Sequence, residues 1–186
     1  MQQVSLISLW LPVLLSAVIV FIAAFVAWTV LPHHRSDWVG IANEASLLQA
    51  IKDLGLGRGQ YVFPRAMTPE GAREAEAREK LKSGPVGSLI IRDAPNMGRS
   101  LTFYFLFTLA VSFLVAYIGY AAIPAGADYR HVFRVLGTTA FLAYSAAEVP
   151  AAIWFGHTWS SVWKSVIDGL VFGLLTGGVF GWLWPA

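Results

Sequence analysis

Four long segments of the chain carry almost no charged side chains, and the first of them, Leu6 to Leu31, carries none. About 20 consecutive apolar residues in a helix span the hydrocarbon core of a bilayer, so this segment can cross with some tilt. The other three segments cover residues 101–122, 132–155 and 163–184. The pattern predicts an all-α membrane protein, a bundle of four transmembrane helices at 6–31, 101–122, 132–155 and 163–184.

The charged residues are concentrated between the first and second apolar segments. Only 13% of the residues are charged, against about 25% in soluble domains, and most of them lie between Arg35 and Arg99. We therefore expect residues 33–99 to form a small α/β cap outside the membrane. Its helix and strand patterns predict the order α-β-α-β, with elements near residues 43–54, 60–63, 68–82 and 87–92.

The composition also argues against several classes of function. The net charge is only +2, and basic residues alternate with acidic ones, so we expect no nucleic-acid partner. The chain has no cysteine, which excludes a disulfide framework, a thiolate metal site and a cysteine nucleophile. No catalytic or cofactor-binding motif is present, so we expect neither a cofactor nor an enzyme activity.

The basic residues indicate how the chain is threaded. Most of the lysines and arginines lie within 33–99, and His33, His34 and Arg35 follow the first apolar segment directly. The positive-inside rule places this cap in the cytoplasm. Both termini and the turn at 123–131 would then be periplasmic, in a multi-pass protein of the bacterial inner membrane.

The last apolar segment has a glycine at every fourth position, namely Gly169, Gly173, Gly177 and Gly181. On a helix this spacing forms one stripe, a glycine zipper, which lets another helix backbone approach closely. A stripe of small residues in the 132–155 segment is formed by Ala143, Ala147 and Ala151. We expect the two stripes to pack together. The alternative is that the glycines face outward and dock another protein, a flat pigment or a lipid.

Two apolar segments carry a tryptophan near each end. Along a helix, Trp10 and Trp28 would lie ~27 Å apart, and Trp163 and Trp182 ~28 Å apart. Tryptophan prefers the two membrane–water interfaces, whose separation matches these distances. We expect these four side chains to be interface anchors.

Four polar residues lie within or next to the last two apolar segments, namely Glu148, His157, Lys164 and Asp168. Ionisable groups in a membrane are costly, and they often mark ion or proton pathways. One interpretation is a proton or ion relay, or a polar substrate site. The other is structural: Lys164 pairs with Asp168, and Glu148 bonds Tyr144, a neighbouring helix or a partner.

The first apolar segment is followed by side chains that metals use as ligands. His33, His34 and Asp37 are candidates, with His157 completing a set from the same face of the membrane. Adjacent histidines point in different directions in regular secondary structure, and no cysteine or HExxH signature accompanies them. We therefore expect interfacial residues after a helix end and no metal site.

Six stretches lie along the chain from Ser36 onward, namely SDWVGIANEASLLQAI, GQYVFP, KSGPVGSL, PNMGRSL, VFRVLGTTAFLAY and VIDGLVFGLLTGGVFGWLWP. Through them, most of the chain from Ser36 onward resembles a family of small bacterial inner-membrane proteins of unknown function. The resemblance implies the four-helix layout and neither a reaction nor a cofactor.

These features favour a non-catalytic accessory subunit of a larger membrane complex, such as a respiratory or photosynthetic one. Its partners would be the lipid bilayer and other membrane subunits. One alternative is a small transporter or proton-conducting protein that uses Glu148 and Asp168. Another is an interfacial membrane enzyme acting on a lipid or quinone, with His33, His34 and His157 at the membrane surface.

Overall fold

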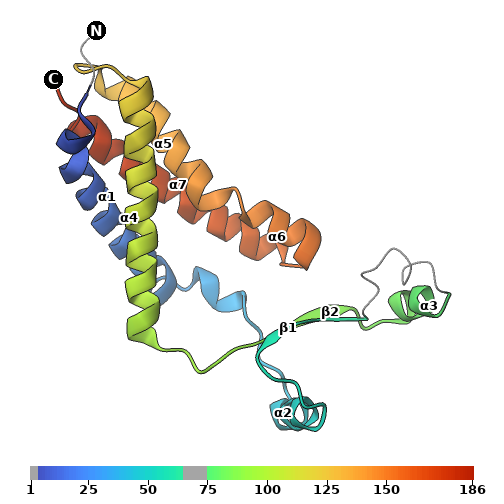
Figure 1. Ribbon diagram of the computed structural model, residues 1–186. Helices are drawn as coiled ribbons and strands as arrows, with labels where there is room; N and C mark the ends of the chain where they lie inside the picture. The colour runs from blue at the N-terminus through green and yellow to red at the C-terminus, as the bar shows by residue number, and fades with distance from the viewer. Residues whose placement is uncertain (1–3, 65–74) are drawn as a thin grey trace. The chain divides into compact units, whose positions relative to one another are not determined.

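The computed structural model describes residues 4–64 and 75–186. The chain forms two compact units, one made of residues up to Trp38 together with Asn96–Ala186, and the other of Val39–Pro95. The first is called the membrane unit and the second the polar unit. The elements of both are labelled in Figure 1.

The membrane unit is mostly helical. Its elements are η1 (Leu6–Leu9), α1 (Trp10–Phe25), η2 (Val26–Val30), η3 (His33–Ser36), α4 (Met97–Ala122), α5 (Tyr129–Ser145), α6 (Glu148–Phe155) and α7 (Trp159–Trp182). In the described part of the chain, three helical stretches are long and apolar enough to cross a membrane, namely Leu6–Val30, Met97–Ala122 and Trp159–Trp182. These stretches are compatible with a multi-pass membrane protein, whereas the fourth predicted span is not among them.

The segment predicted as one helix over 132–155 is divided in two. α5 ends before a turn at Ala146 and Ala147, and α6 begins at Glu148. Pro150 explains the division, because it has no N–H to donate to the Ala146 carbonyl and its ring would clash there in a continuous helix. The division leaves Pro150 in the first turn of α6, where a proline is tolerated. Glu148 therefore lies at a helix start and not inside a long membrane helix.

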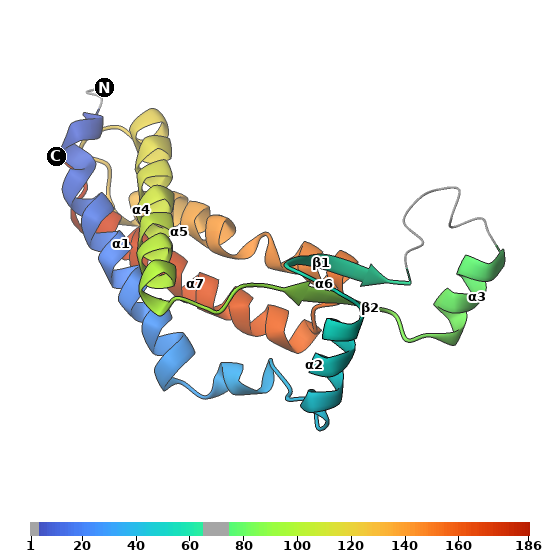
Figure 2. The same ribbon diagram turned by 60° about the horizontal axis from the view of Figure 1, so that its bottom comes forward.

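Helices α5 and α7 run side by side (Figures 1 and 2). The glycine stripe of α7 faces α5. A Cβ atom on Gly173 would lie 2.8 Å from the Gly137 carbonyl oxygen, and one on Gly177 would lie 2.8 Å from the Phe133 carbonyl oxygen. Both obstacles are backbone atoms, which cannot turn aside as a flexible side chain can. The close approach of the two helices therefore requires glycine at these positions.

The surface that receives the glycines differs from the expected alanine stripe. Ala143 and Ala147 are exposed and Ala151 is partly exposed. The nearest atoms to the four glycine positions belong instead to Tyr129, Phe133, Gly137, Phe141, Tyr144 and Ser145. The helix break accounts for part of the difference, because two of the three alanines lie beyond the end of α5.

The first helix packs on the others through buried side chains. Leu9, Val115, Leu136 and Phe180, which come from η1, α4, α5 and α7, belong to one buried cluster. The buried hydroxyl of Ser16 on α1 donates to the hydroxyl of Ser112 on α4 at 3.0 Å. Such contacts join helices from both ends of the sequence into one unit.

The C-terminal end of the chain lies against the turn between α4 and α5. Trp184 Nε1 donates to the Pro124 carbonyl at 3.0 Å, and the Gly126 N–H donates to the Pro185 carbonyl at 2.9 Å. Figure 1 shows the beginning of α1 at this same end of the membrane unit. The helices thus run alternately up and down.

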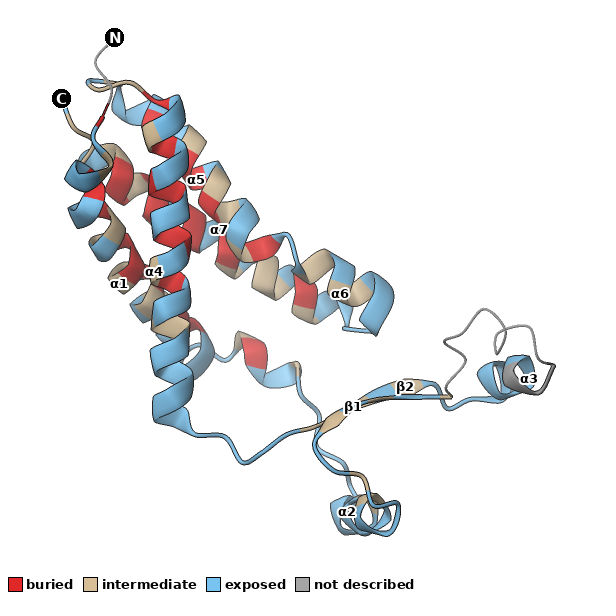
Figure 3. Ribbon diagram, viewed as in Figure 1, coloured by how far each residue is buried: buried red, intermediate tan, exposed pale blue. Residues whose placement is uncertain are grey.

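The polar unit contains a two-stranded sheet and two short helices. Its elements are α2 (Glu44–Asp53), β1 (Gly59–Phe63), α3 (Ala75–Ser83) and β2 (Gly87–Ile91). The strands pair antiparallel, with Gly59 opposite Ile91. Residues 68–74 of the predicted 68–82 helix lie outside the described residues. Wherever exposure is described in this unit, no residue is buried (Figure 3).

We predict that Gly177→Ala destabilises the membrane unit by about 1–3 kcal/mol, because the added methyl group forces α5 and α7 apart. The matched control is Gly178→Ala, since the nearest atom to a Cβ there is the Tyr129 hydroxyl oxygen at 3.8 Å. This neighbouring substitution should be neutral or stabilise by up to ~1 kcal/mol through helix propensity. The measurement is unfolding in one detergent. Equal stability of the two variants would contradict the packing argument.

Candidate functional site

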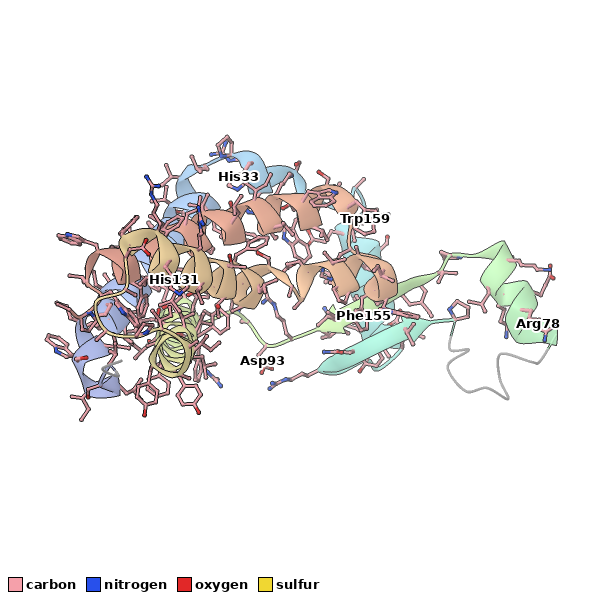
Figure 4. All side chains as sticks on the ribbon, turned by 90° about the horizontal axis from the view of Figure 1, so that it is seen from above. His33, Arg78, Asp93, His131, Phe155 and Trp159 are labelled. Atoms are coloured by element: carbon pink, nitrogen blue, oxygen red, sulfur yellow. The ribbon has the colours of Figure 1, made fainter. Side chains whose placement is uncertain are left out.

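Five side chains of the membrane unit form a buried or half-buried polar group, which we call the His–Asp cluster. Its members are His33, His34, Asp37, Lys164 and Asp168. The first three come from η3 and the residue after it, and the last two come from α7. His33 is labelled in Figure 4, where it lies beside α7.

The sequence after the first apolar helix turns the chain toward α7. Leu31 precedes Pro32, and a residue before proline favours an extended backbone, which Leu31 adopts with ψ of 140°. Pro32 then opens the 3₁₀ turn of η3. This tight turn brings the rings of His33 and His34 within 4.2 Å of each other, measured between centroids.

Asp168 receives both histidines. His33 Nε2 lies 3.2 Å from Asp168 Oδ1, and His34 Nε2 lies 2.8 Å from Asp168 Oδ2. One nitrogen from each ring and one Asp168 oxygen all lie within 4.8 Å of one another. Two imidazoles and a carboxylate that converge in this way have the composition of a metal-ligand set.

His34 is the centre of the cluster. Its Nδ1 lies 2.6 Å from Asp37 Oδ2, and the side chains of His34 and Asp37 are each only 3% exposed. The Trp28 ring stacks on the imidazole, with the centroids 3.9 Å apart and the planes 2° from parallel. Both ring nitrogens and one ring face of His34 are therefore occupied, which fixes its orientation.

Lys164 joins the cluster through Asp37. Its Nζ donates to Asp37 Oδ1 at 2.5 Å and to the Ser36 hydroxyl at 2.8 Å. The structural interpretation of the sequence paired Lys164 with Asp168 one helical turn away, whereas the hydrogen bonds of Asp168 go to the two histidines. Both charged residues of α7 thus bind the segment that follows the first helix.

The cluster shifts the pKa values of two of its groups. Burial is the strongest influence on His34 and lowers its pKa, but the hydrogen bonds and negative charges of Asp168 and Asp37 raise the pKa above the ordinary histidine value. Burial raises the pKa of Asp37, but the hydrogen bonds from Lys164 and His34 hold it below the ordinary value. The environment therefore favours a charged imidazolium beside a charged carboxylate.

Two of the residues singled out in the sequence lie outside the cluster. His157 is exposed on the connection between α6 and α7. Glu148 is half-buried in the first turn of α6, and no hydrogen bond or ion pair within the described residues joins it to Asp168 or Tyr144. The Tyr144 hydroxyl has no hydrogen-bond partner among them either.

The four tryptophans expected at the membrane surface, Trp10, Trp28, Trp163 and Trp182, are all more than half exposed. The contact between Trp28 and His34 was not anticipated. No local sequence pattern predicts the hydrogen bonds between the histidines and Asp168 either. His34 lies 134 positions from Asp168 and His33 lies 135 positions from it.

No protein-family model matches the chain, and comparisons with curated proteins and with solved structures also find no match. The His–Asp cluster is therefore interpreted from its own geometry. That geometry can hold a cation, retain protons, or fasten the end of the first helix to α7.

We predict that Asp168→Asn lowers stability by about 1.5–3 kcal/mol, because it removes the charge that accepts from two histidines. The measurement is unfolding in detergent with a chelator present. The control is Asp93→Asn, whose partner Arg58 and own side chain are 77% and 76% exposed. An ion pair this exposed contributes less than about 1 kcal/mol. A loss no larger for Asp168→Asn than for the control would show that the cluster does not hold the helices together.

Proposed function

We propose that the protein is an accessory subunit of a larger membrane complex and has no catalysis of its own. The observation that carries this proposal is the exposure of the polar unit: none of its residues with described exposure is buried. A unit whose described residues form no fully buried core gains order from contact with another surface.

The parts of the polar unit that are described cannot supply that core. A two-stranded sheet is at best marginally stable by itself in water. The exposed face of the hairpin carries Val62 on β1 and Ile90 on β2. The residue Ile90 is 65% exposed. Apolar side chains on an unpaired sheet face are typical of a surface that contacts another protein. We take that protein to be another subunit of the same membrane complex.

The membrane unit supports the membrane location that this proposal requires. Its three long helices carry large exposed apolar side chains along their length, as expected of helices in contact with lipid. We place the protein in the bacterial inner membrane, with α5 and α6 together making a fourth crossing, the polar unit in the cytoplasm and both termini in the periplasm. The basic residues that flank the first and second helices motivate this orientation.

Neither alternative has the same support. A transporter using Glu148 and Asp168 would need these groups on one pathway, and no bond between them is present in the part of the chain that the structure describes. An interfacial enzyme would place His33, His34 and His157 together, but His157 is not a member of the His–Asp cluster.

The test is purification of the full chain, tag-free or epitope-tagged, from its native membrane in mild detergent. We expect the chain to co-purify with at least one other membrane subunit in a fixed ratio. Quantitative mass spectrometry of the purified sample measures that ratio. Recovery of the wild-type chain alone, from several mild detergents, would contradict the proposal.

A pair of variants tests whether the polar unit makes the contact. We expect Ile90→Asp to reduce the recovered partner at least about tenfold, because a buried unpaired charge at an interface costs more than ~1.4 kcal/mol. Lys82→Asp introduces the same residue at an exposed polar position of α3 and should leave the ratio unchanged. Equal recovery with both variants would exclude the hairpin as the docking surface.

A further inference from the structure

We propose that His33, His34 and Asp168 bind a divalent transition-metal ion of the zinc class, at the point where the first membrane helix ends against α7. The three ligand atoms come from two segments far apart in the sequence and lie within 4.8 Å of one another. This inference is independent of the accessory-subunit proposal, because a bound ion can serve a structural subunit and an enzyme equally.

The ligand distances are close to those that a metal needs. Ligand bonds of about 2.1 Å in a tetrahedral site place the ligand atoms about 3.4 Å from one another. The Asp168 oxygens now lie 3.2 Å from His33 Nε2 and 2.8 Å from His34 Nε2. Both nitrogen–oxygen distances lie within about 0.6 Å of that spacing, and the two ring nitrogens, which lie no more than 4.8 Å apart, would have to approach by at most about 1.4 Å.

Asp37 prepares His34 for this role. Its carboxylate accepts from Nδ1 of the His34 ring at 2.6 Å, which leaves Nε2 as the nitrogen directed at Asp168. Metal-binding histidines commonly have this arrangement, in which a carboxylate fixes the ring and its tautomer from the far side. On binding, Nε2 of His34 releases its proton to solvent and gives its lone pair to the metal, while the Nδ1–H bond to Asp37 stays.

Lys164 explains why Asp37 acts as a positioning residue and not as a ligand. Its ammonium group occupies the second oxygen of Asp37, so both oxygens already accept hydrogen bonds within the cluster. Among the described residues, Asp168 forms no ion pair with a lysine or arginine, and its oxygens accept from the two histidines, whose protons a metal ion would replace. The carboxylate that a metal ion can reach is therefore that of Asp168.

The ligand types select the class of metal. Two imidazoles and one carboxylate, without a thiolate, suit zinc and its first-row neighbours, whereas magnesium and calcium prefer oxygen ligands alone. Three protein ligands also leave a fourth position for water or another small ligand. His33 is the most exposed of the three side chains and gives solvent access to the site.

The test is a titration of the purified full chain, without a polyhistidine tag, in detergent after removal of metals by a chelator. We expect one Co²⁺ per chain to bind with the visible absorption bands of a four-coordinate ion, and Zn²⁺ to displace it. Calorimetric titration with Zn²⁺ gives the affinity, and Mg²⁺ should not compete. Absence of saturable Co²⁺ and Zn²⁺ binding by the wild-type chain would overturn the proposal.

Five variants assign the site. His33→Ala, His34→Ala and Asp168→Ala should each lose saturable binding, and Asp37→Asn should weaken the affinity about 10–100-fold while one ion still binds. His157→Ala, which alters an exposed histidine outside the cluster, should bind as the wild type does. Circular dichroism and gel filtration establish that each variant is folded. Should His34→Ala or Asp168→Ala fail to fold, the more exposed His33→Ala decides, and wild-type affinity in that variant would refute the assignment.

Discussion

The membrane unit depends on the close approach of α5 and α7 at positions where neither helix has a Cβ atom. Gly137 on α5 lies against Gly173 and Gly177 on α7, so the contact is made by backbone against backbone. Lipid surrounds membrane helices with hydrocarbon as apolar as their own side chains, so packing of this kind, and not the hydrophobic effect, holds them together. The contact sets the rotation of α7 about its axis.

That rotation determines where the charged residues of α7 point. Gly169 faces Ser145 on α5, and neighbouring residues on a helix point about 100° apart. Asp168 is therefore directed to another side of α7, where η3 supplies His33 and His34. A charge at the edge of a membrane is costly unless it is paired. The His–Asp cluster meets this requirement by bonding each charge to at least one other member.

The two units of the chain differ in how far their side chains are buried against one another. In the membrane unit, buried apolar and polar groups from η1, α1, α4, α5 and α7 contact one another. In the polar unit, Tyr61 on β1 lies opposite Leu89 on β2, but the described residues bury nothing fully. The membrane unit can therefore be understood from its own contacts, whereas the described residues of the polar unit form no fully buried core.

Much of this architecture was evident from the sequence, because hydropathy, caps and turn residues act locally. The apolar segments beginning at Leu6 and Leu101, and the short strands near Gln60 and Gly87, were all predicted. Tertiary structure alone decided the rest. A 3₁₀ turn after Pro32 brings together two adjacent histidines that a regular helix or strand would separate. Their partner Asp168 lies 134 positions beyond His34, and no local pattern encodes a contact that exists only after the helices have packed.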